Sequence, residues 1–202
     1  MTELSAEKIF SMQEHSFKNF HAKGLDYLCL RRGPLLTVKA YFFDGDTRHL
    51  PEVVAPHDHR YDFRTQVLSG AVANTEFTPS AGGDQYEAFE YQTPLNGGDG
   101  FTWVGTKGLK VWNRRAYEKG MAYDMRYDQF HTIKILADRT VLLLFQYEDR
   151  LPVTVPTLTF RKGDKAPPNL SGLYERMSED DVVRRVDQLE ALVGQTEIRG
   201  LT

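Results

Sequence analysis

The pattern of hydrophobic and polar positions divides the chain into helical ends and a strand-rich middle. The first segment has a suitable N-cap in Ser5 and a suitable stop in Gly24. Its apolar positions are Ile9, Phe10, Phe17 and Phe20. We therefore predict an N-terminal helical segment over residues 1–24 whose aromatic face packs on the core. His15 and His21 lie there beside charged residues, and we interpret both as surface histidines.

The middle of the chain, residues 27–160, consists of short apolar or alternating runs that are typical of strands. The runs cover residues 35–43, 63–77, 85–92, 101–105, 109–115, 130–136 and 140–148. Between them stand TPSAGGD, PLNGGDG, TKG and ADR, whose Gly, Pro, Asp and Asn residues are typical of hairpins and tight turns. Short strands at this spacing predict an antiparallel sandwich or barrel, so the fold class is an all-β core with flanking helices.

A second helix is predicted near the C-terminus, over residues 178–194. Ser178 is a suitable N-cap for EDDVVRRVDQLEALV, the acidic first turn suits a helix N-terminus, and Gly194 is a suitable stop. One face carries Val182, Val186, Leu189 and Val193. We predict that this face packs on the barrel or on a second subunit, which makes a homodimer reasonable. The charged positions predicted to be solvated are Arg184, Arg185, Asp187 and Glu190.

Composition narrows the class of protein. At 202 residues, with 26% charged and 41% hydrophobic residues, the chain suits one folded domain over residues 1–202. The net charge of -3 offers no basic surface for nucleic acid. No apolar run approaches the roughly 20 residues that cross a bilayer, and MTELSAEKIF lacks a basic region followed by an uninterrupted apolar one. We therefore expect a cytoplasmic protein without membrane contact. The single cysteine, Cys29, excludes an internal disulfide and a cysteine-built zinc site.

The candidate chemistry lies in PHDHRYDFRTQVLSG, which holds two of the six histidines. Because side chains alternate along an extended chain, His57 and His59 project to one side and Asp58 to the other. Two imidazoles can converge on one ion at about 2.1 Å, but they need a third ligand from elsewhere to hold it. His131, at the start of an apolar strand in YDQFHTIKI, is the candidate. An H-x-H pair alone is also compatible with ordinary polar surface.

Other side chains near this motif are candidates for supporting a metal or binding a substrate. Asp62 could join the ligand set, but its place at the end of a short turn favours a role as a hydrogen-bond acceptor in the surroundings of the site. Arg64 could hold a substrate carboxylate through a bidentate pair, and Gln66, on the same strand face, could line the pocket. His49, in the loop-like TRHLPE, is a weaker candidate for a fourth ligand.

The same stretch resembles the first motif of the cupin superfamily, G-x5-H-x-H-x3-4-E-x6-G. His57, His59 and Gly70 match in register, whereas the opening glycine is missing. The glutamate position falls on Phe63, or on Arg64 with the longer spacer, and neither is a carboxylate.

The remainder of the resemblance is more limited. Of the second cupin motif, G-x5-7-P-x-G-x2-H-x3-N, only His131 is present. The chain is more similar to cupin-like proteins that carry H-x-H-P-W-D-F and a downstream F-H-R-I, whose activities are largely unassigned. The resemblance covers roughly residues 35–150 and implies a double-stranded β-helix, a small jelly roll with the metal inside.

A cupin that lacks the glutamate resembles the thiol dioxygenases, such as cysteine dioxygenase, in which three neutral histidines hold iron(II). The resemblance implies His57, His59 and His131 as ligands of an ion that keeps its two positive charges, favours an anionic co-ligand and leaves positions open for dioxygen. It also suggests Tyr147 as a catalytic residue, because Tyr147 follows His131 at about the separation found for an active-site tyrosine in that family. A strand-end tyrosine with its hydroxyl in water is the simpler interpretation.

Three functions remain open at this point. The first, which we favour, is an iron(II)-dependent dioxygenase that acts on a small polar or anionic substrate. The second is an isomerase, lyase or hydrolase in which zinc, nickel or manganese acts as a Lewis acid. The third is a non-catalytic barrel that binds a small molecule, which the missing glutamate and the reduced second motif allow. The fold alone cannot choose among them, because this architecture hosts unrelated functions.

Overall fold

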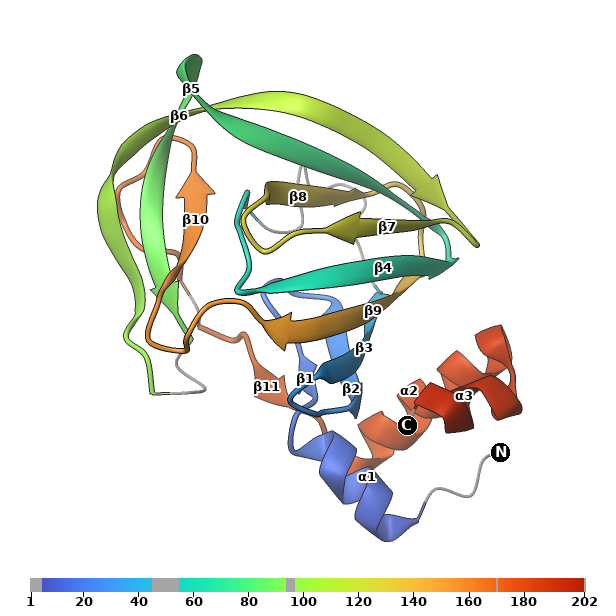
Figure 1. The fold of residues 1–202 in the computed structure, drawn as a ribbon. Coiled ribbons are helices and arrows are strands. Elements are labelled where there is room, and N and C mark those ends of the chain that lie inside the picture. Colours follow the sequence, from blue (N-terminus) through green and yellow to red (C-terminus); the bar gives the residue numbers. More distant parts are fainter. Residues whose placement is uncertain (1–4, 45–54, 94–96, 170, 202) are drawn as a thin grey trace.

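The structure, a computed structural model, describes residues 5–44, 55–93, 97–169 and 171–201. The described chain forms two antiparallel β-sheets that face each other, with helices at its N- and C-terminal ends (Figure 1). The predicted all-β core with flanking helices is thereby confirmed. The pair of facing sheets also fits the jelly roll that the cupin resemblance implies.

The first sheet has seven strands and carries most of the core. Its order is β11 (Glu175–Arg176), β1 (Phe17–Lys18), β2 (Leu25–Arg31), β3 (Leu36–Phe43), β9 (Thr140–Asp149), β4 (Tyr61–Ser69) and β7 (Ala122–Met125). The non-consecutive neighbours β3, β9 and β4 bring segments far apart in the sequence side by side. This order places β4, which follows the H-x-H segment, between β9 and the edge strand β7.

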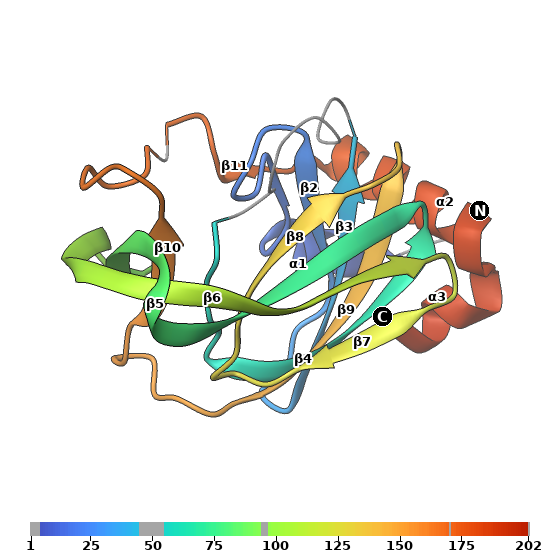
Figure 2. The same cartoon turned by 90° about the horizontal axis from the view of Figure 1, so that it is seen from above.

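The second sheet has four strands and is dominated by one long hairpin. Its strands are β10 (Thr157–Arg161), β5 (Ala71–Gln92) and β6 (Gly100–Glu118), with β8 (Phe130–Ile135) also paired to β5. Figure 2 shows the hairpin of β5 and β6 crossing over the first sheet and extending beyond it. Contrary to the prediction, TPSAGGD and TKG do not separate strands but lie within β5 and β6. A register shift accommodates them, because Leu109 is opposite both Pro79 and Asp84.

Gly70 makes the junction between the two sheets. It separates β4 from β5 and has φ of 72°, a conformation that favours glycine. A Cβ atom at this position would also lie 2.8 Å from the Cα atom of Thr140. The glycine of the cupin-like motif is therefore required by the local geometry, and it lets the chain pass directly from one sheet to the other.

The N-terminal helix is shorter than predicted. α1 (Ala6–Gln13) begins at the predicted N-cap Ser5, whose side chain accepts a hydrogen bond from the backbone N–H of Lys8. The chain then leaves the helix, so that Phe17 lies in β1 rather than on a helical face. The reason is Ser16, whose hydroxyl donates to the carbonyl of Met12 at 2.6 Å and accepts the backbone N–H of Cys29 in β2 at 2.9 Å. This pair of bonds ties the end of the helix to the sheet.

The C-terminal helices are α2 (Glu179–Val193) and α3 (Gln195–Leu201). The predicted cap of α2 is confirmed, because Ser178 and Asp181 form a reciprocal capping box. Val182, Val186 and Leu189 are buried against the first sheet, so the apolar face packs on this chain's own barrel. Within the described part of the chain, no helix is long and apolar enough to cross a membrane.

One residue of α2 contradicts the prediction of a solvated charged face. Arg185 is only 3% exposed and forms an ion pair with Asp26 of β2 and another with Asp44. Its guanidinium also lies 4.7 Å from the centre of the Phe42 ring. Two carboxylates and an aromatic face therefore compensate a charge that is buried between the helix and the sheet.

The strands of the first sheet separate two environments by simple alternation. On β3, Val38, Ala40 and Phe42 point to the helices and belong to the largest apolar cluster. Thr37, Lys39 and Tyr41 of the same strand point the other way and line a cavity between the sheets. This cavity side of the sheet is where the histidines of the H-x-H motif lie.

Candidate metal centre

Two segments bring the three histidines together. His57 and His59 lie in an extended segment just before β4, and His131 is the second residue of β8. The backbone N–H of His57 donates to the carbonyl of His131 at 3.0 Å, and the reverse bond has the same length. His57 thus forms an isolated bridge to β8 and does not belong to a regular strand. The bridge fixes the two segments opposite each other.

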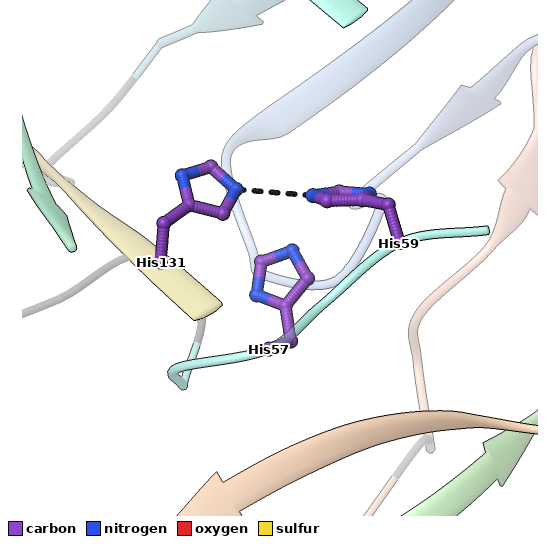
Figure 3. A group of neighbouring side chains, drawn as sticks. All are labelled: His57, His59 and His131. Carbon is purple, nitrogen blue, oxygen red and sulfur yellow. Dashed lines mark hydrogen bonds between the residues drawn. The ribbon is translucent and has the colours of Figure 1, made fainter. Parts of the chain in front are cut away.

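The rings of the three histidines point toward one another (Figure 3). Their potential ligand nitrogens all lie within 4.8 Å of one another, and Nε2 of His59 is 3.0 Å from Nε2 of His131. Two nitrogens bound to one ion at about 2.1 Å and at a right angle would be about 3.0 Å apart. The spacing of the imidazoles therefore fits a shared metal ion.

Hydrogen bonds orient two of the three rings for this purpose. Nδ1 of His57 lies 2.9 Å from the carbonyl oxygen of Ala55, and Nδ1 of His131 lies 2.7 Å from Oδ1 of Asn74 on β5. Because both oxygens are acceptors, each Nδ1 donates its proton, and each Nε2 is left unprotonated. In His131 this Nε2 accepts the hydrogen bond from Nε2 of His59. Such outer partners fix the tautomer that a metal-binding histidine needs.

Burial keeps the three imidazoles neutral. Loss of hydration lowers the pKa of His57, and it lowers the pKa values of His59 and His131 well below their usual range. The proximity of the other imidazoles lowers the pKa of His59 further. Neutral imidazole is the form that binds a metal ion, so the site is competent at neutral pH. The group that the described residues form contains no carboxylate.

Phe63 occupies the place where a cupin motif has its glutamate. Its side chain is 2% exposed, and its ring centre lies 4.7 Å from that of His59 and 5.6 Å from that of His131. An apolar ring therefore borders the histidines on this side. A bound divalent ion would keep its full positive charge there.

The two aspartates of the motif bond to neighbouring segments. Asp62 accepts the backbone N–H of Tyr127 at 2.9 Å with one oxygen and Nε of Arg150 at 2.9 Å with the other. This geometry suits the acceptor role that we preferred for Asp62, and Asp62 does not belong to the group of side chains whose ligand atoms converge. Asp58 accepts the backbone N–H of Leu158 on β10 at 2.6 Å. Its side chain thus turns away from the two histidines, as the alternation of an extended chain requires.

The structure does not bring the other predicted residues to the centre. Arg64 is exposed and pairs with Asp124 at 2.8 Å, and Gln66 shares this outer face of β4. The cavity is lined instead by Phe63 and Thr65, which alternate with Arg64 and Gln66 along β4 and point to the other face of the sheet. These placements correct the predictions of a substrate clamp at Arg64 and of a pocket-lining Gln66.

Tyr147 also lies away from the centre. Its side chain is 43% exposed, and β9 presents Gln146 and Glu148 to the cavity instead. Because alternate residues of a strand face opposite sides, the hydroxyl of Tyr147 cannot reach a substrate held by the histidines. The simpler interpretation of a strand-end tyrosine fits this position, and the catalytic assignment is corrected. His49 lies outside the described residues.

A cavity of about 1140 Å³ opens beside the three histidines. Its walls carry side chains that the sequence reasoning did not select, namely His21, Tyr27, Lys39, Tyr41 and Tyr61. One signal was available in the sequence, because a lysine stands in the middle of the apolar run LLTVKAYFF. His21 has an exposed side chain, as predicted, but its Nδ1 lies 2.8 Å from the hydroxyl of Tyr174 at the edge of this cavity.

Comparison with known proteins gives structural similarity only. No protein-family model matches the chain, and no curated protein matches it. Similar solved structures include KdgF from Halomonas sp., with 18% identity, a TM-score of 0.38, and coverage of 67% of this chain and 90% of that one.

Two further similar structures show the range of the comparison. A cupin superfamily protein from Desulfitobacterium hafniense has 11% identity and a TM-score of 0.37, over 62% of this chain and 78% of that one. Hydroxypropylphosphonic acid epoxidase from S. wedmorenis has 12% identity and a TM-score of 0.41, over 67% of this chain and 56% of that one. A cupin superfamily protein is thus among the similar structures, but similarity at this level bears on neither family nor activity.

Proposed function

We propose that this protein is a mononuclear metal-dependent enzyme, an iron(II)-dependent dioxygenase that acts on a small polar or anionic substrate. His57, His59 and His131 would hold the ion through Nε2. The proposal is supported chiefly by one observation, the convergence of three neutral imidazoles on a common point beside a cavity. Two of them have their Nδ1 atoms bonded to oxygen acceptors, which leaves the Nε2 atoms available.

The chain's own residues would prepare this centre for an anionic ligand. Iron(II) held by three imidazoles would supply open coordination positions for a substrate and for dioxygen. Phe63 presents an apolar ring where a carboxylate would otherwise reduce the charge of the ion. Asn74 and the carbonyl of Ala55 orient His131 and His57, and Asp62 fixes the segment through Tyr127 and Arg150.

Metal content tests the first part of the proposal. Protein purified without a histidine tag should contain about one transition metal ion per chain by elemental analysis. The substitutions His57→Ala and His131→Ala should abolish the bound metal, whereas His15→Ala, which removes a histidine outside the group, should retain it. A wild-type protein that contains no metal and binds none on titration would refute a metal-dependent function and favour a non-catalytic binding protein.

Oxygen consumption tests the second part. The iron(II)-loaded protein should consume dioxygen in the presence of at least one member of a panel of small carboxylates and thiols, and His131→Ala should not. A protein that binds metal tightly but consumes no dioxygen with any member of the panel would favour Lewis-acid chemistry with zinc, nickel or manganese instead.

A further inference from the structure

Lys39 is a buried cation in the wall of the same cavity. It lies in the middle of β3, is 9% exposed, and lines the cavity together with Tyr41. Its ammonium donates to the hydroxyl of Tyr61 at 3.4 Å and lies 5.0 Å from the ring centre of Tyr61 and 5.5 Å from that of Tyr27. None of the carboxylates in the described residues forms a salt bridge with it.

The surroundings of Lys39 compensate its charge only in part. A buried ammonium is costly unless an anion or several good acceptors replace its hydration. Two aromatic faces and one long bond to a phenol recover a fraction of that cost. Arg185, the other cation that is buried among the described residues, has two carboxylate partners on the opposite side of the sheet. Lys39 therefore retains a charge that an anionic ligand in the cavity can neutralise.

A single ring connects Lys39 to the three histidines. The ring centre of Tyr61 lies 5.0 Å from the ammonium of Lys39 and 5.3 Å from the ring centre of His59. Lys39, Tyr61 and His59 all line the same cavity. A small molecule can therefore reach Lys39 with one end and the histidine group with the other.

The cavity wall beside Lys39 is aromatic. Phe20, Tyr27 and Tyr41 are in mutual contact, with ring centres 4.7 Å apart for Phe20 and Tyr27 and 5.4 Å apart for Tyr27 and Tyr41. All three line the cavity. Aromatic side chains of this kind stack favourably on a flat, apolar ligand. A lone ammonium matches one negative charge, whereas a dianionic phosphate is usually held by several donors or by the fork of an arginine.

We propose that Lys39 binds the carboxylate of the substrate and that Phe20, Tyr27 and Tyr41 pack on its ring, so that the site takes an aromatic carboxylate. The substrate's role in catalysis rests on the proposed function, but binding of the anion requires only the cavity. Lys39 thus sets the charge of the accepted molecule, and the aromatic wall sets its shape.

Calorimetric titration of the full-length protein with benzoate and with benzamide tests this proposal. These molecules have the same size and ring, but only benzoate carries a charge. Benzoate should bind the wild type saturably, and Lys39→Met should weaken it by at least about tenfold, because a desolvated charge pair is lost. Lys39→Arg should restore most of the affinity. Lys107→Met, which removes an exposed lysine of β6, should leave it unchanged.

Further ligands separate the parts of the proposal. Benzamide should bind weakly and equally to the wild type and to Lys39→Met. Propionate, which has the charge without the ring, and inorganic phosphate should both bind more weakly than benzoate. Tighter binding of phosphate would overturn the assignment of a carboxylate. Equal affinities for benzoate and benzamide, or no saturable binding of benzoate, would overturn the role of Lys39.

Stability distinguishes a binding role of Lys39 from a structural one. Lys39→Met should have a melting temperature equal to or above that of the wild type, because it removes a buried charge that is only partly compensated. A lower melting temperature with unchanged benzoate affinity would show that Lys39 is structural. If this variant does not fold, Lys39→Gln should show the same loss of benzoate affinity. The wild type alone should in any case bind benzoate more tightly than benzamide.

Binding of benzoate at Lys39 should not depend on the metal centre. His57→Ala should lose the metal but still bind benzoate, and Lys39→Met should keep the metal content of the wild type. A wild type without metal that still prefers benzoate to benzamide would refute the proposed enzyme and leave the anion site intact.

Discussion

The two faces of the seven-stranded sheet use polar groups in opposite ways. On the helix side, β3 contributes Val38, Ala40 and Phe42 to an apolar cluster, and the buried cation Arg185, which packs there, is matched by carboxylates. On the cavity side, the same strand contributes Lys39 and Tyr41 to a wall that also carries the three histidines.

The two faces differ in whether their polar groups have protein partners before any ligand binds. Arg185 donates from Nε and one Nη atom to Asp26 and from its other Nη atom to Gln188. Among the residues that the structure describes, Lys39 has a single phenol acceptor, and the three imidazoles bring their nitrogens together without a carboxylate. Satisfied polar groups stabilise the folded chain, whereas unsatisfied ones in a cavity favour the binding of a complementary ligand.

The largest effect is expected where this comparison predicts a purely structural role. Asp26→Asn should lower the free energy of unfolding by about 3–5 kcal/mol, because it leaves the buried guanidinium of Arg185 without its main counter-charge. Urea-induced unfolding measures this, with an unchanged m-value indicating that only stability is affected. Metal content should not change.

Asp187→Asn is the matched control for this prediction, because Asp187 lies exposed on the same helix as Arg185. It should change the free energy of unfolding by less than about 0.5 kcal/mol. A similarly small loss for Asp26→Asn would mean that Asp44 and Gln188 suffice to compensate Arg185, and the contrast with Lys39 would fail.

The helix-side structure shows what a sequence pattern can and cannot predict about the fold. The cap at Ser178 and the buried positions Val182, Val186 and Leu189 follow from local signals, because capping and periodicity involve residues close in sequence. The burial of Arg185 does not, since its partner Asp26 is 159 positions away. Ser16 ended the first helix early for the same reason, through a bond to Cys29 in a neighbouring strand.

An intermediate effect is expected at Asn74, whose amide oxygen accepts the proton of Nδ1 of His131. Asn74→Leu keeps a similar volume but removes the acceptor, so His131 loses the partner that fixes its tautomer. The affinity for iron(II) or zinc should fall about 10- to 100-fold, which corresponds to about 1.4–2.7 kcal/mol. Competition with a chelator of known affinity measures the change.

Asn113→Leu provides the control for Asn74→Leu. Asn113 lies on β6, and its amide donates to Glu76 rather than to a histidine. Its replacement should leave metal affinity within about twofold of the wild type, since the partners that tune a metal centre are those bonded to its ligands. Equal losses in the two variants would indicate a general disturbance of the second sheet instead of a specific effect on His131.

The cavity side shows a different limit of prediction. Spacing along an extended chain correctly placed His57 and His59 on one side and Asp58 on the other, and it placed Arg64 with Gln66. Alternation tells which residues share a face, but it does not tell which face of a strand borders a cavity. That depends on the order of strands in the sheet, so Arg64 and Gln66 were assigned to the wrong side. Lys39 was overlooked for the same reason, because the cavity that its face of β3 borders is lined by residues distant in the sequence, such as Tyr61 and His131.

The smallest effect is expected at Asp58, the residue between the two histidines. Burial raises the pKa of its carboxyl group to about 6, and the bond from Leu158 opposes this shift without cancelling it. Because the folded state holds this proton more tightly than the unfolded chain, Asp58 costs stability as the pH rises from about 4 through 6. In Asp58→Asn the amide oxygen can still accept the N–H of Leu158, but the charge is absent.

Relative to the wild type, Asp58→Asn should therefore gain stability as the pH rises, on the order of 1 kcal/mol by pH 7 and close to nothing at pH 4. Urea-induced unfolding across this range, with a chelator present so that metal binding does not contribute, measures the difference. Asp99→Asn, at an exposed site, tests whether the effect belongs to the buried position. A difference that shrinks with rising pH would show that the bond to Leu158 outweighs burial. Asp58 would then stabilise the fold in its charged form. The contrast between the two faces would in that case extend into the motif itself, because a structural carboxylate would lie between two histidines whose nitrogens are available to a ligand.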